Sequence, residues 1–184
     1  MLIENKEITL FNGKRIIIRS AIETDALSLC QHRYVTSGET YFMARYPEEC
    51  SFDIVDMEKK LIHIQNSDCD FMVTAFLDNE VIGDLGVTRI RNHMKYSHRA
   101  YMGISIQKQY CNMGLGSIMI EYAVKQAKMN GFEQLELGVF EDNAEAIHIY
   151  EKFGFQKYGV QPRAFKLKDG TYRDEIIMVK MLQT

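Results

Sequence analysis

A glycine-rich turn between a predicted strand and a predicted helix constrains this chain most. Residues 107–116 read QKQYCNMGLG and join the apolar run 101–106 to a helix that we expect to begin at Leu115. Glycine lets a ligand approach the main chain closely. The first turn of a helix offers unpaired N–H groups and partial positive charge. The turn is therefore typical of an anion site, and a phosphate or pyrophosphate is the expected ligand.

Two familiar nucleotide patterns do not fit this turn. A P-loop would have a lysine directly after its last glycine, and none follows Gly116. A dinucleotide fingerprint would have a third glycine where the chain has Met119. Alone, Gly114-x-Gly116 is also compatible with an ordinary strand-to-helix turn.

A second pattern lies at residues 139–155, which read VFEDNAEAIHIYEKFGF. Asn143 is a suitable N-cap for a short helix, and Gly154 is a suitable residue to end it. Asn143 and Tyr150 are seven positions apart, so we expect them two turns apart on one helix face.

Together the two patterns resemble the GNAT superfamily of acyl-CoA-dependent N-acetyltransferases, from about residue 15 to residue 182. The resemblance implies that the glycine turn binds the coenzyme A pyrophosphate and that the preceding strand pairs with the pantetheine arm. It implies these coenzyme-binding residues: Ile104, Ser105, Ile106, Cys111, Asn112, Met113, Gly114, Leu115, Gly116, Ser117 and Asn143. It also implies that Tyr150 protonates the departing thiolate.

Two positions depart from the family pattern. Cys111 stands where the family commonly has Arg or Gln, which removes one side chain from the phosphate site. Tyr101 stands near the place where many members carry a Glu, and a tyrosine is not a base at neutral pH. The remaining candidates for the general base are water, Glu39, Asp84, His93 and His98. Residues 38–46 have the aromatic and charged side chains of a binding loop, and equally those of a packed connection.

Composition excludes several other classes. The chain has 184 residues, 46% apolar and 26% charged, which predicts one globular domain over residues 1–184. Its net charge of −3 disfavours nucleic acid as a partner, and no apolar run is long enough to predict a membrane span. The four cysteines show no metal-binding or disulfide spacing, and the start of the chain lacks the pattern of a secretory signal. We therefore expect a cytoplasmic protein without a metal; a homodimer remains open.

Hydrophobic periodicity predicts an alternation of strands and helices. The predicted strands are 15–20, 71–77, 80–90, 99–106, 134–139, 155–166 and 175–182. The predicted helices are 23–34, 53–65, 115–130 and 143–152, with a loop at 37–49. The order is that of GNAT proteins and predicts an α/β fold, in which a mixed, mostly antiparallel sheet has helices on both faces.

The leading interpretation is direct transfer of an acetyl group from acetyl-CoA to the primary amine of a small molecule or protein. An alternative is a non-catalytic acyl-CoA-binding module, which Cys111 and the missing strand Glu favour. A nucleotide-phosphate binder is disfavoured, because the turn lacks the lysine that such sites use.

Overall fold

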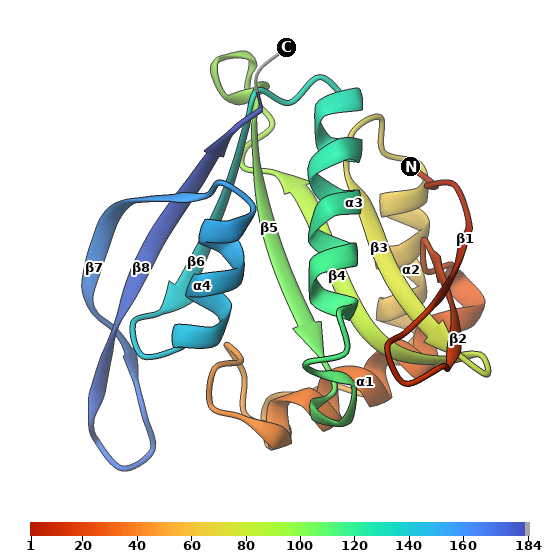
Figure 1. Ribbon diagram of the computed structural model, residues 1–184, viewed down its shortest axis with the longest axis horizontal. Coiled ribbons are helices and arrows are strands. Elements are labelled where there is room, and N and C mark those ends of the chain that lie inside the picture. The colour runs from red at the N-terminus through yellow and green to blue at the C-terminus, as the bar shows by residue number, and fades with distance from the viewer. Residues whose placement is uncertain (183–184) are drawn as a thin grey trace.

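Eight strands in the order β1-β2-β3-β4-β5-β6-β8-β7 form one sheet in the computed structural model, which describes residues 1–182 (Figure 1). The strands are β1 (Lys6–Thr9), β2 (Arg15–Arg19), β3 (Phe71–Leu77), β4 (Glu80–Arg89), β5 (Arg99–Ile106), β6 (Gln134–Phe140), β7 (Gln156–Lys166) and β8 (Tyr172–Met181). The helices are α1 (Ala26–Glu39), α2 (Ile54–Gln65), α3 (Leu115–Met129) and α4 (Ala144–Lys152). All neighbouring strands are antiparallel except β5 and β6, which are parallel. This confirms the predicted fold class.

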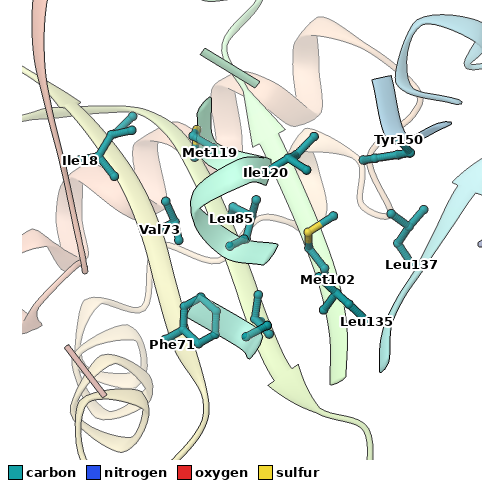
Figure 2. Close-up of a cluster of buried hydrophobic side chains, with 14 of the residues drawn as sticks. Ile18, Phe71, Val73, Leu85, Met102, Met119, Ile120, Leu135, Leu137 and Tyr150 are labelled. Carbon is teal, nitrogen blue, oxygen red and sulfur yellow. The ribbon is translucent and has the colours of Figure 1, made fainter. Parts of the chain in front are cut away.

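The helices cover opposite faces of the sheet. In Figure 1, α3 and α4 lie in front of the sheet, and α1 and α2 lie behind it. Figure 2 shows the apolar cluster on the front face, to which β3 contributes Phe71 and Val73 and α3 contributes Met119 and Ile120. Met72 belongs to a separate cluster beneath α1 and α2. Because successive strand residues point to opposite faces, β3 is buried on both sides and reads as a continuous apolar run.

Short polar signals set several of the element boundaries. Asp78 and Asn79 both have positive φ, 50° and 67°, as a tight turn between β3 and β4 requires. The Asp53 side chain accepts a hydrogen bond from the Asp56 N–H at 2.9 Å and caps α2. Asn143 caps α4 in the same way, through the Ala146 N–H at 3.3 Å. These boundaries agree with the sequence prediction.

Strand β1 was missed by the sequence prediction, which placed the first strand at residues 15–20. Ile8 is the only apolar residue among its four, so the segment carries no strand signal. It becomes a strand because it pairs antiparallel with β2, with Ile8 opposite Ile16. Most other element ends lie within a few residues of their predicted positions; β8 begins at Tyr172 rather than 175.

Helix α1 is longer than predicted. A 3₁₀ turn at Glu23–Asp25 precedes it, and the helix continues through Ser37 and Gly38 to Glu39, where a loop was expected. A Cβ added to Gly38 would lie 3.6 Å from Pro47 Cγ, so the glycine lies close to the returning chain. Packing against the next segment therefore overrides the local loop signal.

The pairing between β5 and β6 stops after three residue pairs, which join Arg99–Tyr101 to Gln134–Glu136. Beyond these pairs β5 continues its main-chain pairing only with β4, and β6 continues its main-chain pairing only with β8. Figure 1 shows the two strands meeting near the top and diverging downward. At the closed end, Arg99 binds Glu136 through two hydrogen bonds, Nε–Oε1 at 2.5 Å and Nη2–Oε2 at 2.8 Å. This ion pair holds together the only parallel contact in the described sheet.

Loss of the Arg99–Glu136 ion pair should destabilise the fold. Glu136 is 4% exposed, and Glu136→Ala would leave the Arg99 guanidinium without its carboxylate. We expect a loss of about 2 kcal/mol, below the roughly 3–5 kcal/mol of fully buried pairs because Arg99 stays partly exposed. Urea unfolding measures the loss. The matched control Glu133→Ala changes an exposed side chain and should stay within about 0.5 kcal/mol of the wild type. Equal stabilities of the two variants would contradict this role of the pair.

Candidate active site

A cleft of about 660 Å³ opens where β5 and β6 diverge. The diverging edge of β5, the glycine turn and α4 form its walls. The predicted site residues on these walls are Ile104, Ser105, Ile106, Cys111, Asn112, Gly114, Gly116, Ser117, Asn143 and Tyr150. Met113 and Leu115 were also predicted, but their side chains lie elsewhere. Leu115 is 1% exposed in the core, and the Met113 sulfur accepts a hydrogen bond from Asn12 Nδ2 at 3.1 Å. Only the main chain of these two residues is available to a ligand.

The glycine turn has the geometry of an anion site. Gly114 has φ 84° and is the N-cap of α3, and Asn112 has φ 58°. A Cβ added to Gly114 would lie 3.0 Å from the Phe11 ring. Gly116 lies in the first turn of α3 and faces the cleft. Because neither glycine carries a side chain, a phosphate can approach the N–H groups of this turn closely, and the turn fits a pyrophosphate.

The β1–β2 hairpin forms a wall that sequence reasoning missed. Phe11 is 87% exposed and lines the cleft beside Gly114. The Lys14 ammonium lies 5.4 Å from the centre of the Tyr110 ring, next to the glycine turn. No sequence signal links this hairpin to a turn about a hundred residues later. On α4, in contrast, the helical spacing from Asn143 and Tyr150 points directly to Ala146, which also lines the cleft.

A second cavity, of about 390 Å³, lies on the α1 side of the same β5 edge. It shares Met43, Ile104 and Ser105 with the cleft, so the two spaces meet at this edge. Its charged lining residues are Arg33, Arg45 and Asp84. A molecule in each space would thus have one end at the same edge of β5.

The segment after α1 lies across the open end of the two diverging strands. The Phe42 ring packs against Phe140 at the end of β6, with ring centres 5.7 Å apart. The Tyr41 hydroxyl donates to Asp142 at 2.7 Å. These contacts place Met43 beside the β5 edge. The segment is therefore both a packed connection and a wall of the two cavities, which combines the two interpretations that the sequence left open.

The four side chains considered as bases fall in different places. Asp84 lines the second cavity, where it accepts the Thr74 hydroxyl at 3.1 Å and lies 3.8 Å from the Arg33 guanidinium. Burial raises the pKa of Asp84. Glu39 lines the cleft, and its carboxylate accepts the Lys108 N–H at 2.7 Å.

The two histidine candidates lie away from both cavities. His93 and His98 belong to the connection between β4 and β5, and neither lines the cleft or the second cavity. The His98 carbonyl bonds to the start of β6, which is the closed end of the diverging strands. Their position does not favour either of them as the base, because the topology places this connection at the opposite end of β5 from the glycine turn.

Tyr150 is 7% exposed and reaches the cleft from α4, and Figure 2 shows it near Leu137 at one end of the apolar cluster. Within residues 1–182 no hydrogen bond engages its hydroxyl. Burial raises the pKa of Tyr150, and the neighbouring Tyr101 raises it further, so the phenol stays protonated at neutral pH. The Tyr101 hydroxyl accepts the Gly138 N–H at 3.0 Å and so bridges the diverging strands.

The surroundings of Cys111 disfavour its thiolate form. Burial raises the pKa of its thiol, and the nearby carboxylates of Glu39 and Glu145 raise it further. The thiolate, which is the nucleophilic form, is therefore disfavoured despite the adjacent helix N-terminus.

His32 is a buried residue that sequence reasoning missed, because a lone histidine in a helix carries no signal. Its Nε2 lies 2.9 Å from the Ser105 hydroxyl, and the side chain is 1% exposed. Within the described residues its Nδ1 is buried without a partner. Burial lowers the pKa of His32 to about 4, and the Arg33 charge contributes in the same direction. A neutral imidazole therefore holds the hydroxyl of a residue that lines both cavities.

Comparisons with known proteins agree with this geometry. Residues 32–155 match the sequence model of the Acetyltransferase (GNAT) family. The chain belongs to this family. The solved structure of a GNAT-family acetyltransferase from Streptococcus pneumoniae is similar to this chain, with a TM-score of 0.86 and 30% sequence identity. The likeness covers 91% of this chain and 99% of the S. pneumoniae chain. The membership confirms the sequence resemblance, and neither the match nor this neighbour favours the non-catalytic alternative.

Two further comparisons bear on the ligands. The L-amino acid N-acetyltransferase AaaT of Escherichia coli (strain K12) is 29% identical over 110 residues, which are 59% of this chain and 67% of AaaT. The protein yncA of Salmonella typhimurium was solved with acetyl-CoA. It has a TM-score of 0.80 and 16% identity, covering 92% of this chain and 95% of yncA. The second likeness shows the shared fold.

Burial of His32 makes the stability of the fold depend on pH. Its pKa is lowered from 6.5 to about 4 in the fold, so the unfolded chain binds the proton more readily between these values. The contribution of the neutral His32 side chain to the stability of the fold is therefore fully present above pH 6.5 and is lost as the pH falls toward 4. We expect the wild type to lose about 2 kcal/mol more than His32→Gln between pH 7 and pH 5. Urea unfolding at both pH values measures this difference, and identical losses in the two proteins would contradict it.

Proposed function

We propose that this GNAT acetyltransferase binds acetyl-CoA in the cleft and transfers the acetyl group directly to a primary amine held in the second cavity. The observation that carries the proposal is the junction of the two spaces at the β5 edge, where they share Met43, Ile104 and Ser105. A thioester and an amine that reach this edge from opposite sides are positioned for attack. No acyl-enzyme is required.

Each part of the cleft has a role in this proposal. The N–H groups of residues 113–117 bind the pyrophosphate. The β5 edge is free of strand pairing beyond Tyr101, so the pantetheine amides can bond to Ile104 and Ile106 as an added strand does. Asn143 lines the cleft at the start of α4, where its amide nitrogen is available to the pantetheine while its oxygen caps the helix. Tyr150 donates its proton to the departing thiolate.

The charges of the second cavity favour an acceptor that carries a carboxylate beside its amine. Arg33 and Arg45 outnumber the single acid Asp84 on its walls, and Asp84 already faces Arg33. Guanidinium groups bind carboxylates in a planar, two-bonded geometry, whereas a polyamine would face repulsion from both. The name of the relative AaaT, an L-amino acid N-acetyltransferase, supports the same class. We therefore propose an amino acid or a similar zwitterion as acceptor.

A panel of matched amines tests the activity and the acceptor class together. Thiol release from acetyl-CoA is measured with amino acids and with the amines that lack only the carboxylate, for example phenylalanine and phenethylamine, and with spermidine. We expect kcat/KM to be at least about tenfold higher for the acids, which corresponds to one charge-assisted bond of roughly 1.5 kcal/mol. Arg45→Gln should lower the ratio of kcat/KM for the amino acid to kcat/KM for its matched amine by about tenfold. The matched control Arg91→Gln, in the β4–β5 connection, should keep the wild-type ratio. Equal rates within each pair would contradict the acceptor class, and no turnover with any amine would contradict the activity.

Replacement of Tyr150 tests its role as an acid. Tyr150→Phe keeps the ring and should lower kcat by about 10²–10⁴-fold, because the thiolate then leaves without a proton donor. The affinity for acetyl-CoA should not change, since the ground-state thioester takes no proton. Steady-state rates, calorimetric titration and melting curves measure the three quantities. The control Tyr34→Phe, on exposed α1 surface, should keep wild-type rates. A drop in kcat of less than about threefold would exclude Tyr150 as a required acid.

The other expectations from the sequence stay predictions. They are a single domain, a cytoplasmic location, the absence of a metal and a homodimer. Among residues 1–182, no helix is both long enough and apolar enough to cross a membrane.

A further inference from the structure

The proposed reaction needs a group that takes a proton from the acceptor, because an alkyl ammonium has no lone pair with which to attack. Two of the carboxylates near the β5 edge are already engaged. Asp84 accepts the Thr74 hydroxyl and faces Arg33, and Glu39 accepts a main-chain N–H of the glycine turn. A third carboxylate, Glu175 of β8, has no hydrogen-bond or ion-pair partner among residues 1–182.

Glu175 and Tyr101 converge on one glycine of β6. A Cβ added to Gly138 would lie 3.0 Å from the Tyr101 hydroxyl oxygen and 2.7 Å from the carboxyl carbon of Glu175. Both groups therefore occupy the space that a side chain at this position would fill. The Tyr101 oxygen accepts the Gly138 N–H, which leaves its own proton free to be donated. Because Tyr101 also lines the second cavity, it connects the acceptor space with a carboxylate that lies behind it.

We propose that Glu175 is the general base of the acetyl transfer and that it receives the acceptor's proton through the Tyr101 hydroxyl. The inference rests on the proposed function. It assigns the base to a strand that contributes no residue to the lining of either cavity. The two oxygens are not hydrogen-bonded in the free protein, and catalytic hydrogen bonds of this kind commonly shorten only when the substrate is bound.

The surroundings of Glu175 suit a base. Tyr101 is the titratable group that faces Glu175 from β5. The residues paired with Glu175 in the sheet, Phe140 of β6 and Gln161 of β7, carry no charge. Burial raises the pKa of Glu175, with no opposing cation, and a carboxylate with a raised pKa is a stronger base. Burial also raises the pKa of Tyr101, and the Glu175 charge adds to that effect. Tyr101 therefore relays a proton as a neutral phenol.

The proton balance closes without a further reactant. The ammonium gives one proton to the Tyr101 oxygen as Tyr101 gives its own to Glu175, which leaves a neutral amine. The nitrogen attacks the thioester carbonyl carbon, the carbon–sulfur bond breaks, and Tyr150 protonates the thiolate. The nitrogen's second proton returns to the Tyr150 phenolate, and Glu175 releases its proton to solvent. The products are the N-acetyl compound, coenzyme A and one proton.

The pH dependence of kcat/KM separates a base from a structural group. Glu175→Gln should lower kcat/KM about 100-fold at pH 7. This defect should shrink about tenfold for each unit by which the pH rises, because the remaining rate follows the fraction of acceptor that is free amine. Glu175→Asp keeps a carboxylate and should keep the wild-type profile at a reduced rate. Glu133→Gln, an exposed control, should match the wild type. A Glu175→Gln defect of the same size at every pH overturns the proposal, as does a pH-dependent defect in Asp84→Asn alone.

A double-variant comparison tests the relay. Tyr101→Phe should show the same pH-dependent defect as Glu175→Gln, and the double variant should be no worse than about 100-fold, because both changes interrupt one path. If the kcat/KM defects of the two single variants instead multiplied to about 10⁴-fold in the double variant, proton transfer through Tyr101 would be contradicted.

Carboxyl-carbon NMR of the free enzyme gives a readout that does not depend on turnover. The Glu175 signal is identified by its loss in Glu175→Gln, and its pKa should fall when coenzyme A and the acceptor ammonium are both added, since an opposite charge then lies nearby. An unchanged pKa would overturn the proposal. A wild type that acetylates no amine would instead sink the proposed function, which distinguishes the two failures.

Discussion

The early end of the β5–β6 pairing is the constraint on which the rest of this structure depends. Parallel strands that continued side by side would bury the edges of both and leave no cleft. Here the pairing stops at Tyr101 and Glu136, and the Arg99–Glu136 ion pair holds the closed end. The remaining main-chain groups of β5 therefore face a space instead of a strand. That exposed edge is what joins the cleft to the second cavity.

The groups along this opening share an electrostatic character. Burial raises the pKa values of Tyr150, Tyr101 and Glu175, and it lowers that of His32. In each case the low-dielectric surroundings penalise the charged form. The two tyrosines and the histidine therefore stay neutral at neutral pH. The positive charge near this opening comes from Arg33 and Arg45, which line the second cavity.

Local sequence signals identified several of the elements that form the cleft. The glycine turn, the Asn143 cap and the seven-residue spacing to Tyr150 are short-range patterns, and the structure places all three on the walls of one cleft. Short-range patterns survive in a sequence because helix caps and turns depend on residues only a few positions apart. The same reasoning failed for β1, which is a strand only because β2 pairs with it. It failed for the end of α1, where packing near Pro47 overrides a serine and a glycine.

The sequence by itself thus determined the family, the order of most elements and most of the residues that line the cleft. Only the tertiary structure decided the second cavity and its surroundings. It placed His93 and His98 away from both cavities, placed Asp84 opposite Arg33, and brought Glu175 to Tyr101 across a glycine of a third strand. The physical reason is the origin of each contact. Much of the cleft is built from a turn and a helix start that follow one another in the chain. The groups around the second cavity come largely from separate strands, whose proximity follows from sheet order and register and leaves no local pattern in the sequence.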